Sequence, residues 1–372
     1  MADRAASRPR RRGDWLDDLP FRTIVFHRTA GLYRNLDETV FPERATPAGL
    51  ANARTRVCDA LASAGAASRR PLTVLEGGYA RLLDPATGPG PSYFEGLPVP
   101  ADPKAARWDE ATFADLGGGA MTAVVNAEDH LALFDRSEGP FLRQWKTLDT
   151  VAAAVGQAAP FAYSPDYGHL AANPDHVGTG LVLCCDVSLF GLCVDRTLDP
   201  ALRALDRLGF STTPVFGPYE GEDNPVEAPG CRYLVASVRD TGAERDVVGR
   251  MDAVCRELAR QEQNARLRLL GAKSMELYDF VARSVAAGAC ARTMARSEAL
   301  DLIFAVLFAE DLGLLRLPAR AAELFRALPA ALGDDRLPSG VPGGVRAARA
   351  ALLRPAFAPL LPQVAGTGRC KA

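Results

Sequence analysis

The spacing of apolar residues changes near residue 260, and this change divides the chain into two kinds of structure. Before that point, short apolar and β-branched runs of strand length alternate with stretches rich in glycine, proline and polar residues. Beyond it, apolar residues recur every three or four positions with few breaks, as in packed helices. The sequence therefore predicts a mixed α and β domain followed by an all-helical domain, and 372 residues are enough to give both a core.

Four apolar runs in the first part have the length and composition of strands. They are residues 23–26, 121–126, 181–189 and 232–238. The polar segment HRTAGLYRN that follows the first run is expected to leave the sheet as a loop. Six prolines and three glycines lie between Asp84 and Asp109, so neither a helix nor a central strand is expected there.

Helix signals are clearest at four places. Residues 45–70 are rich in alanine, residues 199–209 begin with Asp-Pro and end with glycine, and residues 251–269 have an amphipathic period. The segment SEALDLIFAVLFAEDLGLL, residues 297–315, is apolar on nearly every face. One helix cannot hide so much apolar surface against a single layer, and we therefore expect the helical region to form a homodimer.

Composition narrows the classes of partner and compartment. Forty-three basic and forty-five acidic residues give a formal charge of -2, so we expect neither nucleic acid nor membrane as a partner. No apolar run approaches the ~20 residues of a membrane-spanning helix, and the N-terminus lacks the apolar stretch of a secretory signal. Eight scattered cysteines without a C-x-x-C pair favour reduced thiols in the cytoplasm and no metal site.

These patterns predict four segments along the chain. A flexible basic tail over residues 1–20 precedes a mixed domain over residues 21–265. A helical dimerisation domain covers residues 266–360, and residues 361–372 form a second flexible tail.

Two polar islands next to predicted strands are the best candidates for chemistry. The common phosphate-loop, dinucleotide, zinc-protease and nucleophile-elbow motifs are all absent. The first island is NAEDH, residues 126–130, which ends a strand with two carboxylates and an imidazole. The second is GHLAANPDHVGTG, residues 168–180, a loop whose backbone N–H groups could face an anion. Taken singly, each is also what a solvated strand end or a turn looks like.

Together, and in this order, the islands resemble the ATP:guanidino phosphotransferase family, which includes creatine, arginine and bacterial protein arginine kinases. NAEDH is similar to the family's N-E-E-D-H, and residues 168–181 are similar to its G-Y-x-x-x-C-P-[ST]-N-[LV]-G-T-G-L-R loop. Residues 26–42 resemble its S-S-R-V-R-L-A-R-N-L segment and the following F-P, with one residue inserted. The helical C-terminal part is similar to the region found only in the protein arginine kinases.

The resemblance implies a guanidino-kinase fold of the α+β class. Such a fold has a mostly antiparallel sheet flanked by helices, followed here by the helical domain. The family transfers phosphoryl from Mg-ATP to a guanidinium, which in a protein arginine kinase belongs to a protein partner. It places about five arginines around the phosphates, a carboxylate beside the guanidinium and a cysteine near the reacting nitrogen.

Few of these groups survive when the resemblance is carried over residue by residue. Glu128 stands at the carboxylate expected to hold and deprotonate the guanidinium, and Arg28 aligns with one phosphate arginine. Asn173 replaces the cysteine and His176 replaces an asparagine of the loop. The glycine-rich part of the active-site loop is kept as Gly178, Thr179 and Gly180.

Most phosphate-binding cations are missing from this alignment. Val182 and Thr213 stand where two arginines are expected, and Ser188 replaces a nucleotide-binding histidine. Losing four charge-assisted hydrogen bonds at roughly 1.5–3 kcal/mol each removes on the order of 10⁴ to 10⁸ in rate if nothing compensates. The sequence therefore favours an impaired or inactive kinase that acts by binding. An active protein-arginine kinase is the alternative, with compensation by one of four other arginines: Arg136, Arg143, Arg203 or Arg232.

Overall fold

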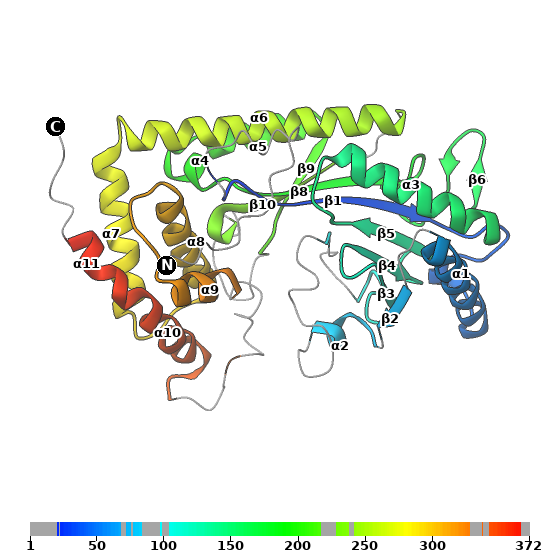
Figure 1. The fold of residues 1–372 in the computed structure, drawn as a ribbon, viewed down its shortest axis with the longest axis horizontal. Helices are drawn as coiled ribbons and strands as arrows, with labels where there is room; N and C mark the ends of the chain where they lie inside the picture. Colours follow the sequence, from blue (N-terminus) through cyan, green and yellow to red (C-terminus); the bar gives the residue numbers. More distant parts are fainter. Residues whose placement is uncertain are drawn as a thin grey trace.

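A computed structural model gives the chain an α+β architecture in which one large sheet carries helices along one side and a group of helices follows at one end (Figure 1). The structure describes residues 21, 23–67, 72–75, 77–83, 97–98, 104–216, 228–237, 242–327, 337 and 342–365. The α+β fold expected from the sequence is confirmed.

The central sheet has eight strands in the order β2-β3-β4-β5-β1-β8-β10-β9, and every neighbouring pair is antiparallel. The strands are β1 (Val25–Arg34), β2 (Leu72–Leu75), β3 (Thr112–Leu116), β4 (Met121–Val125), β5 (Leu131–Asp135), β8 (Leu181–Ser188), β9 (Phe210–Pro214) and β10 (Arg232–Ser237). A separate hairpin is formed by β6 (Tyr163–Ser164) and β7 (Gly168–His169).

The helices fall into two groups. Those on the sheet are α1 (Pro47–Ala67), α2 (Tyr79–Leu83), α3 (Phe141–Ala158), α4 (Phe190–Val194), α5 (Leu198–Arg207) and α6 (Glu244–Leu270). Those of the C-terminal group are α7 (Ser274–Cys290), α8 (Arg296–Asp311), α9 (Ala319–Ala327), α10 (Gly344–Phe357) and α11 (Leu361–Ala365). Short 3₁₀ turns are η2 (Pro42–Arg44), η4 (Pro174–His176), η5 (Pro229–Cys231) and η7 (Ala358–Leu360).

The two faces of the sheet have different surroundings. Alternate residues of β8, such as Leu183 and Cys185, join one large apolar core with the residues of α1, α3 and α6; we call this the helix face. The residues between them, such as Val182 and Asp186, point to the opposite side, which we call the far face. Toward β3, the far face is covered by a small aromatic cluster that includes Trp108 and Phe113.

The region after residue 26 corrects one sequence-based expectation. HRTAGLYR was expected to be a loop, but it continues β1 through the middle of the sheet, between β5 and β8. Polar residues are tolerated in this central strand because both of its neighbours supply backbone hydrogen bonds and its glycine accommodates the Phe134 ring at close range.

The predicted segment boundaries can be compared with the helices of the structure. Residues 1–20 and 366–372 lie outside the described residues. Residues 361–365 were expected to be part of a flexible tail but form α11, where Gln363 exchanges hydrogen bonds with the backbone of Arg316. The expected boundary at residue 265 falls inside α6, which runs without interruption over both the sheet and the C-terminal helices (Figure 1).

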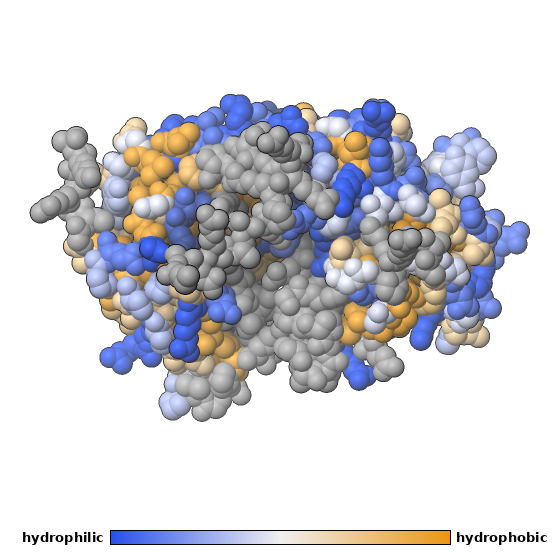
Figure 2. Space-filling view, viewed as in Figure 1, coloured by the Kyte–Doolittle hydropathy of each residue, from blue (hydrophilic) through white to orange (hydrophobic). Residues whose placement is uncertain are grey.

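The apolarity of α8 is explained within one chain. Leu302 to Ala309 are all buried, because α7, α9, α10 and η5 surround this helix. The argument that its apolar faces require a second copy is therefore removed, and the homodimer stays a prediction. Large apolar side chains are exposed where α6 meets α7, and they include Leu267 of α6 and Met275 and Tyr278 of α7. Figure 2 shows hydrophobic atoms near this junction. Within the described residues, no helix is long and apolar enough to cross a membrane.

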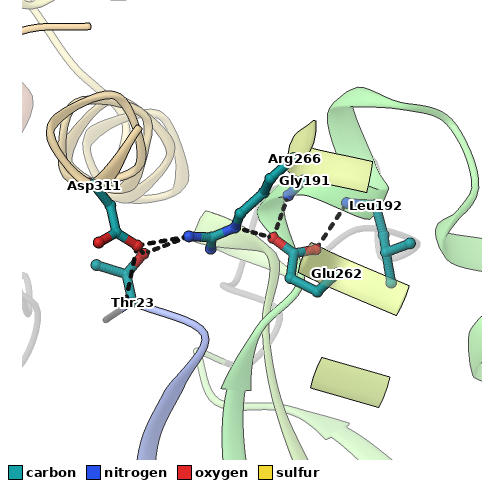
Figure 3. A network of polar contacts seen from close by, with 6 residues as sticks. All are labelled: Thr23, Gly191, Leu192, Glu262, Arg266 and Asp311. Carbon is teal, nitrogen blue, oxygen red and sulfur yellow. Dashed lines mark hydrogen bonds and ion pairs between the residues drawn. The ribbon is translucent and has the colours of Figure 1, made fainter. Parts of the chain in front are cut away.

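A buried polar network joins the sheet to the C-terminal helices (Figure 3). Glu262 of α6 accepts hydrogen bonds from the backbone N–H groups of Gly191 (2.7 Å) and Leu192 (2.9 Å) at the start of α4. Its Oε1 also accepts from Arg266 Nε at 2.7 Å, and Arg266 Nη1 donates to Asp311 of α8 at 2.7 Å. Thr23, just before β1, donates to the same Asp311 carboxylate through its N–H and its hydroxyl.

The burial of this network predicts a large effect of breaking it. Glu262 and Arg266 are both 0% exposed. Glu262→Ala leaves the Arg266 guanidinium with less compensation and two backbone donors of α4 without an acceptor, so we expect a loss of about 3 kcal/mol in the free energy of unfolding. Glu257→Ala is the matched control, because Glu257 pairs with Arg260 on the same helix but both side chains are exposed. Its expected loss in urea unfolding is below about 0.5 kcal/mol, and equal losses in the two variants would contradict this role of the network.

Candidate active site

The two polar islands meet at one end of the sheet. NAEDH forms the turn between β4 and β5, and the loop of residues 170–180 leads into β8. The C-terminal end of β1 lies between them, because β1 pairs with β5 on one side and with β8 on the other. Antiparallel pairing thus brings together three segments that are far apart in the sequence.

Asp129 links all three segments. Its Oδ1 accepts hydrogen bonds from Asn35 Nδ2 at 2.5 Å and from the backbone N–H of Ala172 at 2.7 Å. Asp129 is 2% exposed, and its Oδ2 has no hydrogen-bond partner among the described residues. This carboxylate therefore organises the site, with one oxygen left for a further contact.

His130 has a structural role beside it. Its backbone N–H donates to Asn35 Oδ1 at 3.0 Å, and its Nδ1 accepts from the backbone N–H of Leu36 at 3.3 Å. The acceptor role requires a neutral ring, and burial lowers the pKa of His130 from its ordinary 6.5 to about 4. The Asp-His pair of the motif thus fixes the end of β1.

Glu128 and His176 lie at the accessible side of this cluster. Burial, together with the nearby charge of Asp129, raises the pKa of the half-buried Glu128 carboxyl. The His176 ring stacks on Tyr33 with centroids 3.8 Å apart, and its Nδ1 lies 4.0 Å from Asp129 Oδ2. The structure therefore brings Glu128 and His176, both expected from the sequence, into one site. Tyr33 was not expected, because it lies in the segment that was interpreted as a loop.

The glycine-rich part of the loop is held by Arg34. Its Nη1 donates to the carbonyls of Tyr33 and Thr179 at 2.7 and 2.9 Å. Gly180 has a left-handed φ of +64°, and a Cβ there would lie 2.3 Å from Arg34 Nη1. Gly178 exchanges backbone hydrogen bonds with His169, and Asn173 accepts from the N–H of Asp175 to begin η4. For Asn173, Gly178, Thr179 and Gly180, the contacts within the chain thus account for the loop's shape.

Arg28 does not lie with these residues. It is paired with Cys185 across the β1–β8 ladder, so its side chain shares the helix face, and its guanidinium carbon lies 5.9 Å from the Phe141 ring centre. The only register shift between these strands lies between Val25 and His27, upstream of Arg28. After this shift the β1–β8 pairing is regular, so Arg28 does not share a face with Val182, and its assignment to phosphate stays a prediction that this placement does not support.

When the resemblance is read without the inserted residue, Arg34, Asn35 and Leu36 match the family's R-N-L, and its two upstream arginines fall on Thr29 and Gly31. These two residues pair with Cys184 and Val182, so all four point to the far face. Thr213 and Ser188 also point there, through their pairing with Leu234 and Arg232. The family's phosphate and nucleotide positions thus gather on one face, and none of the residues at the positions named here is a cation.

The four arginines considered as replacements have other positions. Arg143 and Arg203 lie on α3 and α5, the helices that cover the helix face. Arg136 donates to Gly119 O and Thr122 Oγ1, each at 3.0 Å. Arg232 does point to the far face, but its guanidinium is paired with Asp186. Among the described residues, no set of three or more His, Cys, Asp and Glu side chains is placed to hold a metal ion.

Comparison with known proteins agrees with this geometry. The model of the ATP:guanido phosphotransferase C-terminal catalytic domain matches residues 107–265, which contain both polar islands. Residues 107–265 are thus similar to the catalytic domain of the ATP:guanido phosphotransferase family. The match ends within α6, so the C-terminal helices lie outside the catalytic domain that defines the family.

The curated proteins similar to this chain include bacterial protein-arginine kinases. The protein-arginine kinase of Halothermothrix orenii is 27% identical over 80% of this chain and 81% of its own length. That of Moorella thermoacetica is 31% identical over 53% of this chain and 55% of its own length. The chain thus spans most of the first relative and about half of the second. Both of these relatives carry the name protein-arginine kinase.

Solved structures share the fold. A lombricine kinase superposes with a TM-score of 0.50 at 16% identity, covering 64% of this chain and 66% of its own. A duplicated taurocyamine kinase from Schistosoma mansoni gives 0.52 at 16% identity, covering 77% of this chain and 41% of its own. The chain thus spans less than two thirds of either kinase.

The buried neutral His130 predicts a pH dependence of stability. Its pKa is about 4 in the folded state against an ordinary 6.5, so the unfolded state binds more protons between these values. Stability should therefore fall as pH falls from about 6.5 to 4, by up to about 3 kcal/mol from this residue. His130→Asn keeps an acceptor for Leu36 but does not titrate. Urea unfolding at pH 7, 6 and 5 should show a shallower loss in His130→Asn than in the unchanged protein, and parallel curves would contradict the assignment.

Proposed function

We propose that this chain binds protein arginine side chains through its Glu128 site and has lost most of the family's ability to transfer phosphoryl from Mg-ATP. One observation carries the proposal. The far-face positions that correspond to phosphate arginines hold Thr29, Gly31, Val182 and Thr213, while the carboxylate position keeps Glu128. The guanidinium half of the site is preserved and the phosphate half is not.

The phosphate half does not fit Mg-ATP. Family members use this cofactor, but a triphosphate needs cations or N–H donors to offset its charge. Val182 is aliphatic and Gly31 has no side chain, while the Phe134 ring stands 3.0 Å from where a Gly31 Cβ would be. Phosphoryl transfer depends chiefly on positioning the phosphates and stabilising their charge. The phosphate half offers few groups for either task.

The guanidinium half retains suitable groups. Two neighbouring carboxylates, Glu128 and Asp129, lie beside the His176 and Tyr33 rings. A carboxylate can accept two parallel N–H bonds from an arginine, and aromatic faces attract its planar cation. The raised pKa of Glu128 would fall when a guanidinium binds, since the opposite charge favours the ionised form. The names of the relatives, protein-arginine kinase, support a protein arginine as the ligand.

Binding is tested by calorimetric titration of an arginine-rich peptide. We expect Glu128→Gln to weaken binding by about tenfold or more, because one charge-assisted contact is lost. Glu38→Gln is the matched control, since Glu38 is exposed in the loop after β1 and lies outside the cluster. Equal affinity of the unchanged protein and Glu128→Gln would contradict the assignment of Glu128.

Transfer is tested by incubation with Mg-ATP and an arginine-rich protein, with phosphoarginine measured by mass spectrometry. The unchanged protein should form little or none. Combined Asn173→Cys and Val182→Arg should raise formation by about tenfold or more, because they restore a thiol and a phosphate cation. Adding Glu128→Gln should cancel the gain, whereas adding Glu38→Gln should not. Robust phosphoarginine formation by the unchanged protein would overturn the proposed loss of transfer.

A further inference from the structure

An arginine-carboxylate pair fills the far face next to Ser188. Arg232 of β10 donates from Nε to Asp186 Oδ1 of β8 at 3.0 Å, and its Nη2 is ion-paired with Oδ2 of the same carboxylate. Ser188 is the direct neighbour of Arg232 across the two strands. Arg232 is 9% exposed and Asp186 is 3% exposed, so this pair belongs to the interior of the protein.

Three aromatic rings enclose the same guanidinium. The guanidinium carbon lies 4.0 Å from the ring centre of Phe26, 5.5 Å from that of Phe216 and 5.4 Å from that of Phe304. The ring centres of Phe304 and Phe26 are 6.0 Å apart in an edge-on contact. Those of Phe304 and Phe216 are 5.8 Å apart, with the rings tilted by 42°. Asp186, Phe26, Phe216 and Phe304 together form what we call the arginine box. It combines a bidentate carboxylate with cation–π contacts, which is the chemistry that recognises a guanidinium.

The C-terminal helices form one wall of this box. Phe304 comes from α8 and is 3% exposed, whereas Phe26 comes from β1 and Phe216 follows β9. Next to the box, Gly230 donates its N–H to Asp301 of α8 at 2.6 Å. A Cβ on Gly230 would come within 2.2 Å of the Phe304 ring, so α8 and the start of β10 fit closely. The box therefore holds α8 against the sheet.

The box lies next to Ser188, within the half of the far face that the proposed function assigns to nucleotide. Val182, Asp186 and Ser188 alternate along β8 and share this face. Thr213 joins them from β9, across β10. A ligand that approached Ser188 would meet a desolvated ion pair under Phe304, and would have to displace α8 to reach the strands.

From these contacts we propose that Arg232 is an internal plug. Its side chain fills a guanidinium-binding box within the same chain, keeps α8 docked and closes the nucleotide half of the far face at Ser188, while Thr213 of the same half stays exposed. This inference rests on the proposed function for the identity of that half. The box itself would bind a small guanidinium compound if the Arg232 side chain were removed. Closure would thus be built into the chain and would not depend on the missing phosphate arginines.

The first test removes the plug and supplies a substitute. Arg232→Ala should lower the melting temperature by several degrees, because the Asp186 carboxylate stays buried without its partner. It should also speed amide hydrogen exchange in α8. Methylguanidinium at about 10 mM should reverse both effects in Arg232→Ala, with saturation, but not in Arg232→Ala combined with Asp186→Ala. Arg260→Ala, which removes an exposed arginine, is the control and should show neither effect.

If Arg232→Ala fails to fold, a second variant tests the same proposal. Arg232→Lys keeps the charge but loses the planar bidentate contact, so it should show faster exchange in α8 in the same direction. If the folded variants keep the exchange rates of the unchanged protein, or if methylguanidinium acts equally on the Asp186→Ala combination, the plug is overturned.

Nucleotide binding separates this inference from the proposed function. Titration of Mg-ATP into the unchanged protein should show no saturable binding below about 1 mM. Micromolar binding with unchanged exchange in α8 would overturn the plug even if no phosphoarginine is formed. Phosphoarginine formation, by contrast, is the outcome that overturns the proposed loss of transfer, whatever the state of the box.

Discussion

The buried Glu262-Arg266-Asp311 network is the interaction on which the arrangement of the whole chain depends (Figure 3). A buried guanidinium is tolerated only when carboxylates surround it with good geometry, and here these carboxylates come from α6 and α8. The same groups also cap α4 and hold the start of β1. The network joins α6, α8, α4 and the segment before β1, and α8 in this position places Phe304 over the arginine box.

Two arginine-carboxylate centres therefore connect the C-terminal helices to the family's catalytic domain, one on α6 and one on β10. At the other end of the sheet, hydrogen bonds of Asp129 and Arg34 hold the NAEDH turn and the glycine-rich loop beside the end of β1. The chain thus has the fold of the solved lombricine and taurocyamine kinases, and Arg232 and Asp186 are buried beside α8. We propose that such a scaffold, with Glu128 at the carboxylate position, binds arginine without phosphorylating it.

Much of this could be predicted from the sequence where a residue's role depends on its near neighbours. NAEDH and the GTG loop were identified as one site, because their residue types and their spacing match a family pattern. The α1, α5 and α6 helices were expected from local periodicity, and Gly180 is required by a left-handed φ beside Arg34. Tyr33 was missed, because a polar stretch with a glycine gives no strand signal until both neighbouring strands are known.

The sequence by itself predicted the α+β class, the resemblance to the family and the candidate site around Glu128, since each depends on which residue types are present and in what order. Only the tertiary structure decided which face each strand residue occupies. A single register shift before His27 sends Arg28 to the helix face and places Thr29 and Gly31 on the far face. It also decided that α8 is buried within its own chain and that Arg232 is enclosed by rings from three distant segments. Pairing register and long-range packing are properties of the assembled sheet, and local sequence patterns do not encode them.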